Sequence, residues 1–235
     1  MAAFLILRLD GPMQAWGTHT FEDFRPANLF PTRSGLLGLL GACLGLDRSD
    51  TAGLNALAES VTFAVRADAE APRPDGDQPM AKPALKLPDF HTVLDARKVD
   101  GSVNKNPVVS RREYLFDAAF TVAIGSRDGA LYSLDRIAEA LRRPRFTPVL
   151  GRRSCPIARP LLEGEGRMEA ADALAALAQV APQGGLIYAE DTNLGGKDMQ
   201  IRDVPTYGRI RQFATRRLKL HQAQAVGGNA EGGGA

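Results

Sequence analysis

The residues best suited to chemistry form two arginine-rich clusters in the second half of the chain. They are Arg111, Arg112 and Tyr114 in the stretch RREY, and Arg152, Arg153 and Ser154 in the stretch GRRS. Arginine presents a planar fork of N–H donors that matches the oxygens of a phosphate. Residues 111–159 contain ten arginines, no lysine and five acidic residues, a local net charge of +5. This pattern favours phosphate contact, with an ordinary solvated surface as the alternative.

A glycine-rich run, PTRSGLLGLLGACLG at residues 31–45, raises a second possibility for phosphate binding. It lacks the Gly-Lys-Ser/Thr ending of a P-loop and the spacing of a dinucleotide fingerprint. Gly38, Gly41 and Gly45 instead fall on one helical face, which predicts a helix that packs closely against another backbone. At its amino end, Arg33 and Ser34 would offer free N–H groups to an anion.

Composition limits the class of protein. The 235 residues are 44% hydrophobic and 24% charged with a net charge of +2, which is typical of a globular chain. No segment reaches the roughly 20 apolar residues of a membrane span, and the amino terminus does not resemble a secretory signal. Cys43 and Cys155 lie far apart without a CxxC motif, so we expect neither a disulfide framework nor a zinc site. We predict a cytoplasmic protein.

Hydrophobic periodicity predicts the order strand, helix, strand, strand, helix, strand. The predicted strands are 3–9, 61–65, 114–124 and 145–150, and the predicted helices are 34–46, 51–59 and 131–141. This order predicts an α+β fold of the ferredoxin-like, RRM-like type, in which helices cover one face of an antiparallel sheet. The aromatic RNP signature is missing from the central strands, so we expect RNA to contact loops and edges.

An insertion and a carboxy-terminal region complete the predicted organisation. Prolines interrupt residues 70–90, and Asp100-Gly101 predicts a hairpin turn with Lys98 and Lys105 on its arms, so we predict an inserted hairpin over 70–110. The main domain would span 1–160 and a small region 161–221, with a helix at 169–179 and strands near 186–189 and 210–218. The glycine-rich tail, 222–235, is predicted to be disordered.

Four ordered motifs carry a resemblance to a known family. They are LILRLDGPMQAWG (5–17), FPTRSGLLGLLGACLGL (30–46), REYLFDAAFTVA (112–123) and TPVLGRRSCP (147–156). The chain resembles the type I-E branch of CRISPR-associated protein family five, a member of the RAMP superfamily. The resemblance covers most of residues 3–160.

The resemblance implies a ferredoxin-like RAMP domain with a thumb-like hairpin, and a role in Cascade, the RNA-guided surveillance complex of antiviral defence. There the chain would hold the 5′ handle of the crRNA, contact the CasC backbone subunit and the CasA large subunit, and meet target DNA only through the complex. It implies binding and assembly and not catalysis, and we expect no cofactor and no metal. The candidate RNA-binding residues are Gln14, Trp16, Arg33, Ser34, Lys105, Arg111, Arg112, Tyr114, Arg152, Arg153 and Ser154.

Three alternatives stay open. Trp16 and Tyr114 are of a type that more often lies in a core than on an RNA surface. A type I-C branch of the family cleaves repeat RNA without metal, and such chemistry needs paired acid and base groups. The sequence shows no evident pairing for its three histidines, His19, His91 and His221. A plain protein scaffold would instead use the glycine face and the hairpin valines Val93, Val99, Val108 and Val109.

Overall fold

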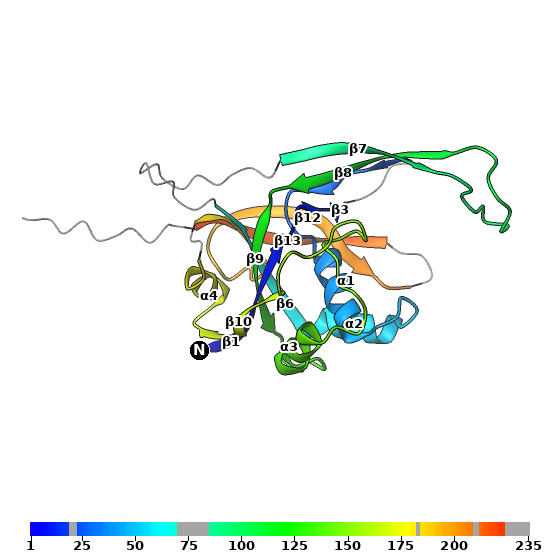
Figure 1. Ribbon diagram of the computed structural model, residues 1–235. Coiled ribbons are helices and arrows are strands. Elements are labelled where there is room, and N and C mark those ends of the chain that lie inside the picture. The colour runs from blue at the N-terminus through cyan, green and yellow to red at the C-terminus, as the bar shows by residue number, and fades with distance from the viewer. Residues whose placement is uncertain (19–22, 70–84, 182–183, 209–211, 224–235) are drawn as a thin grey trace, which may run out of the picture.

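A computed structural model describes residues 1–18, 23–69, 85–181, 184–208 and 212–223. The protein is a mixed α/β structure built on one large antiparallel sheet, with helices packed on it and a pair of long strands above it (Figure 1). Within these residues no helix is long and apolar enough to span a membrane.

The large sheet has seven strands in the order β10-β1-β9-β6-β11-β13-β12. All neighbouring strands run antiparallel. Its members are β1 (Ala2–Asp10), β6 (Val61–Asp68), β9 (Ala119–Ser126), β10 (Leu162–Ala170), β11 (Gly185–Ala189), β12 (Lys197–Thr206) and β13 (Gln212–Ala223). Strands from both sides of residue 160 therefore share one sheet.

Alternation of side chains along β1 divides the core into two layers. Leu5 and Leu7 belong to a cluster with the apolar sides of α1 and α3, whereas Phe4 and Ile6 join a second cluster with α4. The helices are α1 (Arg33–Leu44), α2 (Thr51–Ser60), α3 (Leu134–Arg142) and α4 (Ala173–Ala178). Figure 1 shows α1, α2 and α3 gathered to one side of the sheet and α4 on the other. Burial on both faces explains the continuous apolar run that identified β1.

Two predicted strands differ from the structure. The strand predicted over 114–124 is two strands, because Asp117 adopts a positive φ of 50° and ends β8 (Val108–Phe116) before β9 begins. The prediction of a strand at 145–150 is wrong. The N–H groups of Arg145 and Phe146 donate to the carbonyls of Cys43 and Ala42 near the end of α1, so they are not available for a sheet. The place beside β1 is taken by β10.

A second, smaller sheet lies above the first. Its spine is β8, which pairs with β7 (Leu85–Val93), β2 (Met13–Gln14) and β4 (Phe24–Arg25), while β3 (Trp16–Gly17) pairs separately with β5 (Ala27–Asn28). The segment that joins β7 to β8 projects to the right in Figure 1, above α1 and α2, and turns at Gly101, whose φ is +82°. A turn at Asp100-Gly101 was predicted from the sequence.

Parts of the predicted insertion and of the predicted tail lie outside the described residues. Residues 70–84 of the predicted insertion, and His19, lie outside them. In the carboxy-terminal region the predicted strands correspond to β11 and β13, the short helix is α4, and β12 was not predicted. Residues 222 and 223 of the predicted disordered tail belong to β13, and residues 224–235 lie outside the description.

Candidate nucleic-acid interface

Strand β8 brings one of the two arginine clusters to the surface. Because side chains alternate along a strand, Ser110, Arg112 and Tyr114 lie on one face and Arg111 and Glu113 on the other. Arg111 is exposed and Arg112 is half-buried, with its Nε donating to Ser110 Oγ at 3.0 Å. The side chains of Arg111 and Arg112 therefore project from opposite faces of the small sheet.

The second cluster lies in the loop of residues 151–154, here called the late loop, which contacts β8 through Arg152. Gly151 opens the loop with a φ of +91°, and the guanidinium of Arg152 donates to the carbonyls of Glu113 and Arg25 at 3.0 Å each. Arg152 therefore ties the loop to the small sheet. Arg153 is exposed, and its side chain bonds to no other described residue. Ser154 is also exposed.

Tyr114 links the two clusters. The residue is 2% exposed, the guanidinium carbon of Arg152 lies 4.9 Å from the ring centroid, and the tyrosine hydroxyl lies 3.4 Å from Ser154 Oγ. The same hydroxyl lies 3.0 Å from His91 Nε2, which is also 2.8 Å from the Asp89 carboxylate. A chain of polar contacts thus runs from β7 through β8 to the late loop.

The contacts of His91 correct the sequence interpretation, which found no pairing for this residue. The signal that was overlooked is the spacing of Asp89 and His91, two residues apart, because residues at that spacing share a face of a strand. The register then sets His91 opposite Ser110 and Asp89 opposite Arg112 on β8. The sequence could indicate the pair but not the approach of Tyr114.

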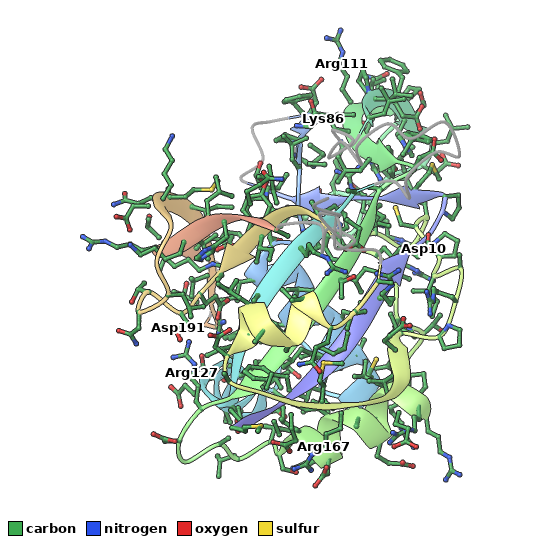
Figure 2. All side chains as sticks on the ribbon, turned by 90° about the vertical axis from the view of Figure 1, so that its left-hand side faces the viewer. Asp10, Lys86, Arg111, Arg127, Arg167 and Asp191 are labelled. Carbon is green, nitrogen blue, oxygen red and sulfur yellow. The ribbon has the colours of Figure 1, made fainter. Side chains whose placement is uncertain are left out.

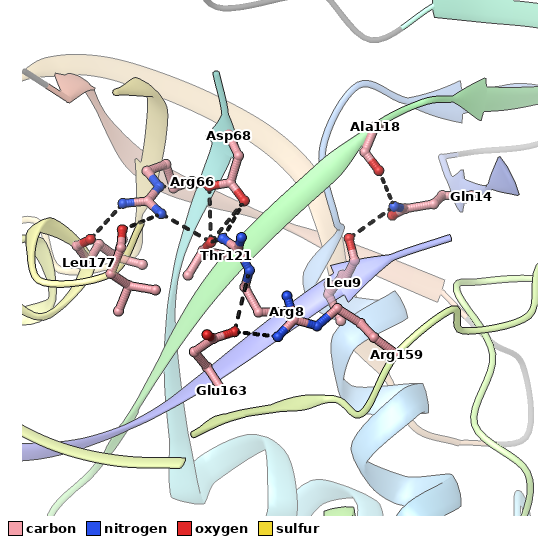
Figure 3. A network of polar contacts seen from close by, with 11 residues as sticks. Arg8, Leu9, Gln14, Arg66, Asp68, Ala118, Thr121, Arg159, Glu163 and Leu177 are labelled. Atoms are coloured by element: carbon pink, nitrogen blue, oxygen red, sulfur yellow. Dashed lines mark hydrogen bonds and ion pairs between the residues drawn. The ribbon is translucent and has the colours of Figure 1, made fainter. Parts of the chain in front are cut away.

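Gln14 and Trp16, both predicted to contact RNA, are fully buried. The amide of Gln14 donates to the carbonyls of Leu9 and Ala118 (Figure 3). Its oxygen accepts the indole N–H of Trp16 at 2.9 Å. The polar atoms of both side chains are thus engaged inside the protein, and their position does not support direct RNA contact.

The polar groups of Arg33 are also hydrogen-bonded inside the protein. Its side chain is 6% exposed, and its guanidinium donates to the Glu190 carboxylate at 2.6 Å and to the carbonyls of Ala58 and Val61. Its backbone N–H donates to the Asp203 carboxylate at 2.7 Å. The amino end of α1, which the sequence predicts as an anion site, already holds a carboxylate of the same chain.

Ser34, one residue later, lines a groove of about 510 Å³ beside α1. The glycine face forms part of its wall. A Cβ added to Gly35 would lie 2.7 Å from the Trp16 ring, whereas one added to Gly38 would meet no atom within 4 Å. Close packing inside the chain therefore explains Gly35, and Gly38 is open to the groove. Lys105 is exposed in the β7–β8 connection.

The described residues contain no group of three His, Cys, Asp or Glu side chains that could hold a metal ion. Burial raises the pKa of the Cys155 thiol beside the late loop, and the Ser154 hydroxyl opposes this shift less strongly. The site therefore offers exposed guanidinium groups, a buried tyrosine hydroxyl and a half-exposed histidine.

The sequence and the fold are both similar to those of CRISPR-associated proteins. The family model described as "CRISPR-associated protein (Cas_Cas5)" matches residues 4–219, and the chain belongs to this family. The chain is 47% identical over 218 residues to the "CRISPR system Cascade subunit CasD" of Escherichia coli (strain K12), covering 92% of this chain and 94% of that protein. The resemblance drawn from the sequence motifs is confirmed.

Two solved structures are similar to this fold. One, described as "CRISPR RNA-guided surveillance complex", superposes with a TM-score of 0.72 at 28% identity, over 94% of this chain and 90% of that one. The other, "Crystal structure of Cas protein", has a TM-score of 0.62 at 25% identity, over 93% of this chain and 94% of the other.

Proposed function

We propose that the chain is the crRNA-binding CasD-type subunit of a type I-E Cascade complex, which holds the 5′ handle of the crRNA in antiviral defence and does not cut RNA. The observation that carries this proposal is the 47% identity to a Cascade subunit over 92% of the chain. The likeness to a chain of an RNA-guided surveillance complex supports it independently. Both matches run nearly the full length of each protein.

The RNA interface would consist of the exposed side chains around β8 and the late loop. We assign phosphate contacts to Arg111, Arg112 and Arg153 and a hydrogen bond to Ser154, with Lys105 farther along the connection and Ser34 in the groove. Tyr114 and Arg152 would position the loop. Gln14, Trp16 and Arg33 would hold the fold beneath this surface, in keeping with their burial.

We infer a ferredoxin-like core with a thumb formed by β7, β8 and their connection. The strand order β10-β1-β9-β6, with α1 and α2 before β6 and α3 before β10, supports the core. The main domain would then extend through Ala170, ten residues beyond the predicted boundary. We further propose contacts with the CasC backbone subunit and the CasA large subunit, in the cytoplasm, as the resemblance implies.

A second candidate function is metal-independent cleavage of repeat RNA. The observation that favours it is the contact of His91 with both Asp89 and Tyr114, since an imidazole and a phenol can act as base and acid. Arginines beside them could stabilise a phosphate. The carboxylate and hydroxyl would orient the imidazole in this arrangement.

One experiment separates the two functions. End-labelled repeat RNA and mature crRNA would be incubated with the full chain in chelator, with and without the CasC subunit, and run on native and denaturing gels. Binding without cleavage, weakened in Arg111→Ala/Arg153→Ala, supports the handle-binding role. Discrete cleavage that is lost in both His91→Ala and Tyr114→Phe would establish the nuclease and overturn the first proposal.

A further inference from the structure

Three side chains form a row across the small sheet on the face opposite Tyr114. In the register of the strands, Arg111 of β8 lies beside Phe24 of β4 and also beside Phe90 of β7. Residues in register share one face, so the order along the row is Phe24, Arg111, Phe90. An arginine is thereby flanked by two aromatic rings that come from separate parts of the chain.

All three side chains of this row face solvent. Phe90 is 63% exposed and Phe24 is 37% exposed, although phenylalanine is normally among the more buried residues. Single exposed apolar residues need no explanation, but two aligned on either side of an arginine form a continuous surface. Arg111 points outward from the sheet at one end of the molecule (Figure 2).

The charge at the centre of the row is available to a ligand. The Arg111 guanidinium bonds to no other described residue, whereas neighbouring Arg112 is bonded to Ser110. Glu113, two residues along on the same face, has its carboxylate 3.0 Å from Lys86 Nζ and accepts the Ala27 N–H at 3.0 Å. That acid is therefore neutralised locally and does not compensate Arg111.

We propose that Phe24, Arg111 and Phe90 form a stacking platform for one dinucleotide step of single-stranded RNA. One base would stack on each ring, and the phosphate between them would contact the guanidinium. This inference rests on the proposed RNA-binding function and adds to it a specific face, a specific binding mode and two residues outside the predicted set.

The distance between the two rings favours single-stranded over double-stranded nucleic acid. Adjacent strands lie about 4.8 Å apart, so the two rings are separated by about 10 Å. Stacked bases of a duplex strand lie about 3.4 Å apart, so a paired strand cannot place neighbouring bases on both rings. Bases splayed from a single strand can do so. Base stacking on aromatic side chains combined with an arginine contact is the usual chemistry of single-strand binding.

A protein partner fits the row less well than RNA. An apolar partner surface would bury the Arg111 charge between two rings without a counter-ion, which is unfavourable. RNA supplies a flat ring and an anion in every nucleotide, in the alternation that the row presents. Contact of this face with another subunit is therefore the alternative that the experiment must detect.

The decisive measurement uses tryptophan fluorescence in the full chain carrying Phe90→Trp. The only native tryptophan, Trp16, is fully buried and out of reach of RNA, so its emission in the unsubstituted chain serves as the baseline for the new indole. Single-stranded handle RNA should quench this emission, and an abasic strand of the same length should not. In separate variants that do not carry the tryptophan, Phe90→Ala and Phe24→Ala should each lower RNA affinity about tenfold. Arg111→Gln should reduce the slope of log K against log salt by about 1.

Matched controls lie elsewhere on the surface. Val99→Ala removes an exposed apolar side chain from the same projecting segment, and Arg143→Gln removes an exposed arginine from the end of α3. Both should leave RNA affinity within about twofold, since neither side chain touches the row. All substituted side chains are exposed, so thermal unfolding should be unchanged in every variant.

The outcomes distinguish this inference from the function on which it rests. If the unsubstituted chain, alone and in the assembled complex, binds no RNA, the proposed function itself is wrong. If it binds RNA but the new tryptophan is not quenched and the row variants match the controls, only the platform is wrong. Loss of subunit assembly with unchanged RNA affinity would also overturn the platform and assign this face to a protein.

Discussion

The Asp203 carboxylate accepts the backbone N–H of Arg33 at 2.7 Å, so a residue of β12 closes the amino end of α1. The same carboxylate receives both arms of the Arg216 guanidinium, at 2.6 and 2.7 Å. Glu190 joins this group through Arg33 and Arg216. This buried cluster of ion pairs thus connects α1 to β12 and β13, which lie near the carboxy-terminal end of the sequence.

Removing Asp203 should destabilise the fold strongly. Asp203→Ala leaves the Arg216 fork and a helix N–H without their acceptor in a buried site, which should lower the free energy of unfolding by about 3 kcal/mol. Urea denaturation measures this directly. Asp198→Ala on the same strand is the matched control, because Asp198 is 73% exposed and pairs only at the surface with Lys219. Equal effects of the two substitutions would contradict the role of the cluster.

Gly151 should tolerate no side chain. Its φ is +91°, and a Cβ would lie 2.0 Å from the carbonyl oxygen of Ala15. Gly151→Ala should therefore displace the late loop and cost about 3 kcal/mol of unfolding free energy, together with a loss of RNA affinity. Gly195→Ala, with no atom within 4 Å of the added Cβ, should leave both thermal unfolding and RNA binding unchanged. Native-like stability of Gly151→Ala would refute the assigned strain.

The sequence predicted elements whose pattern is local and missed relationships that depend on distant chain segments. The run of residues 3–9 and the periodicity of α1 were sufficient to identify both elements. The strand break at Asp117 could not be predicted, because an apolar alternation continues on both sides of it. The last strand was predicted at 145–150, but the N–H groups of Arg145 and Phe146 bond to carbonyls near the end of α1, a contact with a distant segment that the local pattern does not show.

For the candidate site, the sequence indicates which residue types could bind RNA but not which of them the fold buries. Of the arginines in the two predicted clusters, Arg111 and Arg153 are exposed. Arg33 was also predicted to bind RNA, because its residue type and its place at a helix start are suitable for phosphate contact. These local features do not show that Asp203 and Glu190, distant in the sequence, bond to it in the folded protein. The same reasoning applies to Trp16, whose burial depends on tertiary packing against the helix at Gly35.

Both thiols should be unreactive in the folded protein. Burial raises the pKa of Cys43 to about 11, and burial is also the largest cause of the raised pKa of Cys155. At pH 8 only about one Cys43 thiol in a thousand would be ionised, and the thiolate is the reactive form. A disulfide reagent should detect no thiol in the native protein at pH 8 and both thiols in urea.

The direction of the pH dependence follows from the same shift. Because the folded state holds the Cys43 proton above the ordinary thiol pKa, stability attributable to this group is present below about pH 9 and declines as the pH rises further. Thiol reactivity of the native protein should rise between pH 8 and pH 10. Rapid labelling of either cysteine at pH 8 without unfolding would show that the assigned burial is wrong.

Arg152 and Arg153 should differ in what their removal changes. Arg152→Ala removes two hydrogen bonds to backbone carbonyls and should lower the free energy of unfolding by about 2 kcal/mol, weakening RNA binding indirectly. Arg153→Ala removes an exposed side chain that bonds to no other described residue, so stability should change by less than about 0.5 kcal/mol. Its loss should instead weaken RNA binding and reduce the salt slope by about 1, because one phosphate contact is removed. Urea denaturation and RNA titrations at several salt concentrations measure both quantities. With Arg143→Ala as the surface control, an Arg153→Ala chain that matches the control in affinity and salt slope would remove Arg153 from the interface.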